Sequence, residues 1–164
     1  MIEISTTGNL GSLPVDAGPP TPLPPTATPI PVPTATVVTS AVNLFVSAIQ
    51  IDPHPLKCGK DSSITVVVGN NGTEGTTQGG RIKIEAILIS NGSVLQTTET
   101  VFGAIPAGGT TTSAVAHLTV STNFDELQRI QVTVDSLGQI GESNESDNTS
   151  SAGTDYSLAK ANCA

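Results

Sequence analysis

Beyond residue 40 the chain alternates between hydrophobic and polar residues. The alternation is clearest over residues 81–89, where Ile82, Ile84, Ala86 and Leu88 share one face and the charged Arg81, Lys83 and Glu85 lie on the other. Successive side chains of a strand point to opposite faces, so a period of two predicts a strand with one face toward a core. The same reasoning predicts six further strands, over residues 43–51, 62–68, 94–101, 111–120, 127–135 and 149–158.

Turn-forming residues separate these strands, and no stretch has the 3.6-residue period of an amphipathic helix. Pro53 and Pro55 end the first strand, because proline cannot donate to a strand ladder. The pair Asn91-Gly92 predicts a two-residue hairpin turn of type I′ between strands 81–89 and 94–101. Seven short strands with such connections indicate an all-β fold, an antiparallel β-sandwich.

The first forty residues have a different composition. They contain nine of the twelve prolines and none of the six Lys and Arg residues. Proline fixes φ and lacks an N–H, so we expect residues 1–40 to be a disordered Pro/Thr-rich stalk or linker in extended polyproline II conformation. Residues 41–164 are then the folded domain.

The charge and hydropathy of the chain exclude some functions. Its net charge of −8 and pI near 4.4 disfavour binding to nucleic acid, since no basic stripe is present. No segment approaches the ~20 apolar residues of a membrane span. The sequence Met1-Ile2-Glu3-Ile4 lacks the basic and hydrophobic regions of a signal peptide, so we interpret the chain as part of a longer exported protein.

The two cysteines lie where an alternating strand order brings them together. Cys58 is in the turn after the first strand and Cys163 is just beyond the seventh, which places both at the same end of the sandwich. We therefore expect a disulfide between them, with two free thiols as the alternative. Exported proteins form such bonds and cytosolic proteins rarely do.

The same alternating strand order places two polar loops, residues 70–78 and 142–148, together at the opposite end of the sandwich. Acidic and amide side chains of these loops form a candidate ligand or calcium site, because Ca²⁺ prefers oxygen ligands. The alternative is a pair of solvated turns whose Asn and Asp side chains bond to their own backbone. The candidate residues are Asn70, Glu74, Glu142, Asn144, Glu145 and Asp147.

Four short motifs, in order, resemble the CARDB family, the "cell adhesion related domain found in bacteria". They are Leu44-Phe45-Val46 leading to Gly59, Val68-Gly69-Asn70-Asn71-Gly72, Ile105-Pro106-Ala107-Gly108, and Val134-Asp135 followed by residues 142–148. The chain departs from the family where Asn43 and Asp147 stand in place of its frequent Asp and Asn. The resemblance covers residues 43–158. It implies an immunoglobulin-like sandwich of seven strands in a prokaryotic surface protein, with no enzymatic activity.

No catalytic constellation is apparent in the sequence. The two histidines, His54 and His117, are isolated, and no Cys or His pair has metal-ligand spacing. We therefore expect a non-catalytic extracellular or cell-surface module that acts as a spacer or adhesion domain beside neighbouring domains of its parent protein, without a cofactor. The alternative is a glycan- or protein-binding module that uses loops 70–78 and 142–148, assisted by calcium. The absence of Trp argues against a stacking platform for sugars.

Overall fold

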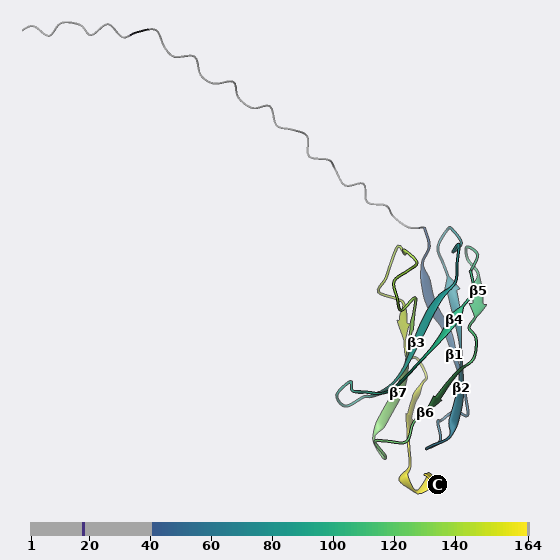
Figure 1. Ribbon diagram of the computed structural model, residues 1–164, viewed down its shortest axis with the longest axis vertical. Coiled ribbons are helices and arrows are strands. Elements are labelled where there is room, and N and C mark those ends of the chain that lie inside the picture. Colours follow the sequence, from purple (N-terminus) through teal and green to yellow (C-terminus); the bar gives the residue numbers. More distant parts are fainter. Residues whose placement is uncertain (1–17, 19–40, 164) are drawn as a thin grey trace, which may run out of the picture. The chain divides into compact units, whose positions relative to one another are not determined.

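The computed structural model describes residue 18 and residues 41–163. The expected disordered segment, residues 1–40, lies outside the described residues except for Gly18. In the described part, nine strands form two antiparallel sheets that face each other (Figure 1). The predicted all-β sandwich of the immunoglobulin-like kind is confirmed, and all seven predicted strands are present, two of them divided into shorter pieces.

The first sheet is built around one long central strand and the second around two. In the first sheet β2 (Asp61–Asn70) pairs with β1 (Leu44–Asp52) on one side and with β5 (Thr110–Thr112) and β6 (Ala116–Thr119) on the other. In the second sheet the order is β4 (Val94–Phe102), β3 (Gly80–Leu88), β7 (Leu127–Val134) and β8 (Thr149–Ser150), and β9 (Asp155–Ser157) also pairs with β7.

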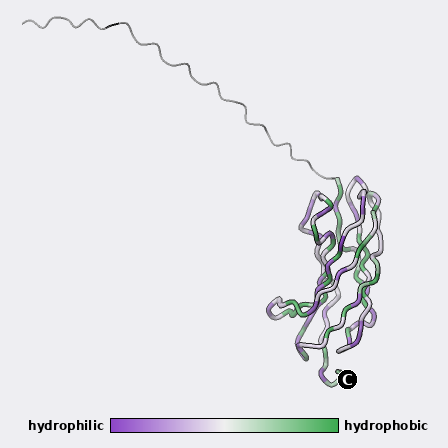
Figure 2. The backbone as a smooth tube through the Cα atoms, in the orientation of Figure 1, coloured by the Kyte–Doolittle hydropathy of each residue, from purple (hydrophilic) through white to green (hydrophobic). Residues whose placement is uncertain are grey.

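The core lies between the sheets and is formed by the alternating apolar positions that the sequence predicts. Hydrophobic and hydrophilic residues alternate along the strands (Figure 2). Burial of an aliphatic side chain contributes about 1.5–3 kcal/mol, so this set supplies most of the driving force for folding. The fully buried members from the three central strands are Ile64, Val66, Val68, Ile82, Ile84, Ala86, Ile130, Val132 and Val134.

The predicted strand 111–120 is divided into β5 and β6 because the chain bonds to both sheets between them. Ser113 stays on β2: its N–H donates to Val66 O at 2.8 Å, and its hydroxyl accepts from Val66 N at 3.0 Å. The next residue turns to β4, where Ala114 N donates to Val101 O at 3.0 Å. This switch joins the two sheets along one edge.

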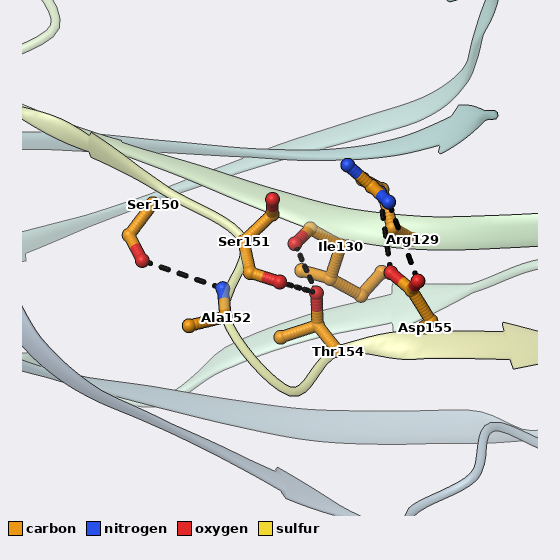
Figure 3. A network of polar contacts seen from close by, with 7 residues as sticks. All are labelled: Arg129, Ile130, Ser150, Ser151, Ala152, Thr154 and Asp155. Atoms are coloured by element: carbon orange, nitrogen blue, oxygen red, sulfur yellow. Dashed lines mark hydrogen bonds and ion pairs between the residues drawn. The ribbon is translucent and has the colours of Figure 1, made fainter.

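The predicted strand 149–158 is also divided, and a side chain takes the place of the interrupted ladder. The hydroxyl of Thr154 lies 2.7 Å from the carbonyl oxygen of Ile130 in β7 and 2.8 Å from that of Ser151 (Figure 3). Next to it, the Nε of Arg129 lies 3.2 Å from Asp155 Oδ1. The turn between β8 and β9 is therefore held against β7 by these side chains together with one backbone hydrogen bond, from Ile130 N to Thr154 O at 3.4 Å.

The predicted type I′ turn at Asn91-Gly92 is wrong. Only Gly92 has a positive φ, of 73°. The strands end at Leu88 and begin again at Val94, and the register between β3 and β4 shifts between Ala86 and Ile87. A register shift adds a residue to one strand, so the hairpin closes through a longer loop than the two-residue turn allows.

The predicted disulfide joins Cys58 to Cys163, 105 residues later, with a Cα–Cα distance of 5.0 Å. Cys58 belongs to the loop between β1 and β2, and Cys163 follows the short 3₁₀ helix Lys160–Asn162. The bond ties the end of the chain to the first sheet, at the end of the sandwich where the C-terminus lies in Figure 1.

Replacing both cysteines by alanine should lower the free energy of unfolding by up to about 4.7 kcal/mol, because the unfolded chain would lose a loop of this length. Urea denaturation of the double variant and of the wild type, each under oxidising conditions, measures the difference. Wild-type protein treated with a reducing agent is the matched control and should behave like the variant. Equal stability of all three samples would contradict a disulfide that constrains the unfolded chain.

Candidate functional site

The loops on either side of the sandwich meet around the segment that leads into β1. The β2–β3 loop, residues 71–79, lies on one side of this segment and the β7–β8 loop, residues 135–148, lies on the other. Both loops donate hydrogen bonds to the backbone of residues 41–44 or accept hydrogen bonds from it. We call this set of contacts the N-terminal clamp.

The β2–β3 side of the clamp is made mainly of backbone amides. Thr73 N donates to Ala41 O at 2.7 Å, and Asn71 N donates to Asn43 O at 3.0 Å. In return Asn43 N donates to the side-chain oxygen of Asn70 at 3.2 Å. A Cβ at Gly72 would collide with Ala41 O, so this close approach requires glycine.

The β7–β8 side of the clamp includes a carboxylate. Ser143 N donates to Val42 O at 2.8 Å, and Leu44 N donates to the Oε2 of Glu142 at 2.5 Å. Val42, Asn43 and Leu44 are all buried, so their backbone groups need these partners in place of water. The start of β1 is therefore fixed by protein contacts on both sides.

The side chain of Asn43 joins the two loops, and the side chain of Asn148 joins two carboxylates within the β7–β8 loop. The Nδ2 of Asn43 donates to Asn71 Oδ1 at 2.8 Å and to Asp147 Oδ2 at 3.0 Å. The Nδ2 of Asn148 donates to Glu142 Oε1 at 2.9 Å and to Glu145 Oε2 at 3.2 Å. Asn148 thus acts as a donor between two carboxylates that would otherwise repel each other, and Asn43 acts as a donor between the two loops.

The structure brings most of the predicted site residues together, but not all of them. Glu142, Glu145 and Asp147 belong to the side-chain network, and Asn70 adjoins it through Asn43. Asn144 does not join them, because its side-chain oxygen accepts only within its own turn, from the N–H and hydroxyl of Ser146.

Three other residues complete the account of this end of the domain. The side chain of Glu74 lines a neighbouring pocket instead of joining the network. Asn43 and Asn148 supply the donors of the network. Asn148 lies in the predicted loop 142–148, whereas sequence reasoning did not assign Asn43 to the candidate site, because its position just before the first strand carries no signal by itself.

Hydrogen-bond acceptors outnumber donors in this network. In this network, three side-chain oxygens are buried without a hydrogen-bond partner among the described residues: the Oδ1 atoms of Asn43, Asp147 and Asn148. A buried acceptor without a donor costs about 1–3 kcal/mol. A ligand that brings hydrogen-bond donors or positive charge would therefore satisfy these oxygens.

None of the six Lys and Arg residues supplies that charge. Three form ion pairs elsewhere, Arg81 with Glu99, Lys83 with Glu85 and Arg129 with Asp155. The other three lie on the segments that carry the two disulfide cysteines, at the opposite end of the domain: Lys57, Lys60 and Lys160.

Burial raises the pKa of Glu142 from 4.5 to about 7. The nearby charges of Glu145 and Asp135 act in the same direction, whereas the hydrogen bonds from Leu44 N and from Asn148 lower the pKa and only partly offset the burial. The carboxyl group that holds the start of β1 therefore titrates close to neutral pH.

A polar pocket of about 230 Å³ adjoins the clamp. The β2–β3 loop supplies Glu74, Thr76, Thr77 and Gln78 to its lining, and the β7–β8 loop supplies Gln139 and Ile140. Another pocket, of about 310 Å³, lies beside the disulfide, and its only ionisable side chains are those of His54 and Lys57. The clamp-side pocket thus offers hydroxyl, amide and carboxylate groups from both predicted loops.

No three His, Cys, Asp or Glu side chains are grouped so as to hold a metal ion within residue 18 and residues 41–163. A calcium site at this end would need amide or backbone oxygens alongside the carboxylates. The expected calcium binding stays a prediction. No helix in the described part of the chain is long and apolar enough to cross a membrane.

The fold places the chain in the class of antiparallel β-sandwich domains, and the comparison with protein families specifies it further. The model of the CARDB family matches residues 41–152. The chain belongs to the CARDB family. No curated protein matches it.

Solved structures of two archaeal domains are similar to this chain. One is the CARDB domain of a Pyrococcus furiosus protein in complex with di-metal ions, with a TM-score of 0.50 and 19% identity, covering 76% of this chain and 94% of that one. The other is a domain of a Methanosarcina acetivorans protein whose name assigns it to the cell surface, with a TM-score of 0.49, 17% identity, and coverage of 74% and 95%.

Glu142 should make stability depend on pH. Its pKa is about 7 in the folded protein and 4.5 in the reference state, so its protonation favours the folded state. The resulting contribution to stability is complete below about pH 4.5 and is lost as the pH rises to about 7. In urea denaturation, the stability of the wild type relative to Glu142→Gln should therefore fall between pH 4.5 and pH 8.

The matched control for this experiment is Glu126→Gln, at an exposed carboxylate that bonds only to Asn123 in its own turn. It measures the effect of removing one exposed carboxylate at each pH value. An equal pH dependence in the wild type and Glu142→Gln would show that the buried carboxylate does not titrate as described.

Proposed function

We propose that the chain is a non-catalytic spacer or adhesion module of a larger exported prokaryotic protein. Residues 1–40 serve as its Pro/Thr-rich stalk, and neighbouring domains of the parent protein are its constant partners. The CARDB family, named for a cell adhesion related domain in bacteria, is consistent with this role. Folds of this kind host many functions, so the proposal rests on the site and not on the fold alone.

The observation that carries the proposal is the fixing of both ends of the domain. Residues 41–44 are held by the N-terminal clamp at one end of the sandwich. Cys163 is bonded covalently to Cys58 at the other end. A module that keeps two attachment points a fixed distance apart needs this arrangement, whereas a free-standing binding domain does not.

An extracellular location is supported by the same disulfide. Bonds of this kind persist in oxidising compartments and are rare in the cytosol. The nine prolines of residues 1–40, interspersed with threonine, add the composition of an exposed and O-glycosylated stalk. Such a stalk would hold the domain at a distance from its anchor.

A second candidate function is the binding of a glycan or protein at the clamp-side pocket. The lining of Glu74, Gln78 and Gln139 comes from both predicted loops and can exchange hydrogen bonds with sugar hydroxyls. No aromatic side chain lines this pocket. Recognition there would depend on hydrogen bonds and not on stacking.

A glycan array probed with the full chain separates these two functions. A spacer gives a blank array, and a binding module gives defined hits that are lost in the double variant Gln78→Ala/Gln139→Ala. The control is Gln96→Ala, an exposed side chain on β4 that lies outside the pocket. Hits that survive in the double variant would mean binding elsewhere on the domain.

Calcium binding by the loop network is the part of the second candidate that can be tested separately. The surplus of buried acceptors around Asn43, Asp147 and Asn148, without a basic residue nearby, favours a hard cation. The Pyrococcus furiosus domain was crystallised with metal ions, which motivates the test.

Calcium at a hundred times its dissociation constant should raise the free energy of unfolding by about 2.7 kcal/mol. Thermal unfolding in CaCl₂, MgCl₂ and EDTA measures this shift, and Asp147→Asn should abolish it. Asp155→Asn, which removes a carboxylate of the Arg129 ion pair, is the control and should keep it. Equal melting temperatures in CaCl₂ and EDTA would rule out a calcium site in this domain.

A further inference from the structure

The covalent path through the domain is much shorter than its sequence. From Asn43 the chain follows β1 along the sandwich to the loop that contains Cys58. The disulfide then leads directly to Cys163, 105 positions later in the sequence, so the segment between the two cysteines lies on a closed loop. All strands except β1 belong to that loop.

Tension applied to the two ends of the domain would follow this path. Force that enters at residues 41–44 and leaves after Cys163 passes through β1 and the disulfide, and the closed loop cannot be extended by it. Residues 43–58 would span at most about 50 Å when fully stretched. The nine residues of β1 already span about 30 Å of that length in the folded state.

The direction of this force matters for β1. Its eight paired residues, from Leu44 to Asp52, run antiparallel to β2 along the long axis of the sandwich (Figure 1). A force along the strand loads these hydrogen bonds together, in shear, whereas a force across the strand would break them one after another. The N-terminal clamp adds bonds at the end where the force enters.

We propose that this domain bears tension. The pairing of β1 with β2 and the N-terminal clamp together resist the release of β1, and we call them the mechanical lock. The disulfide prevents further extension of the chain. This inference rests on the proposed spacer function, which puts the domain in line between two attachment points. It assigns the clamp a task that the spacer role alone does not require, namely to resist the extraction of β1.

Single-molecule force spectroscopy on the full chain, with a handle domain fused to each end, tests the proposal. Oxidised protein should give a single short extension of no more than about 50 Å, and reduced protein should release about 350 Å more, from the 105 sequestered positions. A full-length extension in the oxidised protein would overturn the proposed path.

The lock is tested by the force at which β1 is released. Asn43→Ala removes the side-chain bonds to Asn71 and Asp147 and should speed the release of β1 by roughly tenfold or more at constant force, since each lost bond is worth about 1 kcal/mol. Asn71→Ala removes one of these bonds and serves if the first variant does not fold.

The control for the lock is Thr97→Ala, at an exposed position of β4 inside the closed loop, which should leave the release rate unchanged. Two results would overturn the proposal and leave the spacer function intact. One is an equal release rate in all of these proteins, and the other is release of β1 at forces no higher than those that unzip a hairpin. Specific hits on the glycan array would instead replace the spacer function without altering the measured force path.

Discussion

The disulfide between Cys58 and Cys163 is the constraint on which the last part of the sandwich depends. β8 and β9 contribute only two and three residues to the ladder with β7. Ordering each residue costs about 1–2 kcal/mol of backbone entropy, and so short a ladder offsets little of it. The covalent bond limits the freedom of this segment, and the burial of Tyr156 and Leu158 then holds it on the core.

The opposite end of the domain is held without a covalent bond, and its chemistry is different. Carboxylates and amides of two loops surround the backbone of residues 41–44, and no basic side chain balances them. The backbone N–H of Leu44 and the amide of Asn148 supply the donors instead, and the pKa of Glu142 rises to about 7 as a result of burial. One end of the module is thus fixed by a covalent bond, and the other includes a carboxyl group that titrates near neutral pH.

The sequence predicted the fold well because the strands are amphipathic and the turns are marked by proline and glycine. The position of Cys163 beyond the last strand was enough to pair it with Cys58, since alternating strands leave few choices. The divisions of two strands were not predictable, because Ser113 and Thr154 replace ladder bonds with side-chain bonds that only the folded neighbours define. The type I′ turn at Gly92 was wrong because a register shift between Ala86 and Ile87 changes the loop length.

For the candidate site, the sequence indicated the correct loops but not what they enclose. The sequence predicted a ligand or calcium site among the acidic residues of these loops, and that site stays a prediction. The structure shows that the chain's own backbone lies between the loops. Asn43 lies between the two loops, and its side chain donates hydrogen bonds to both of them. A single asparagine before a strand carries no signal by itself.

Hydrogen exchange, resolved by residue in oxidised and reduced protein, tests most directly whether the two ends are fixed independently. The amides of Asn43, Leu44 and Ser143 should exchange as slowly as those of the central strands in both the oxidised and the reduced protein. Reduction should then expose only the amides of β9 and the 3₁₀ helix. Rapid exchange at Leu44 in the oxidised protein would mean that the clamp does not hold the chain, and the account of this domain as a module fixed at both ends would be wrong.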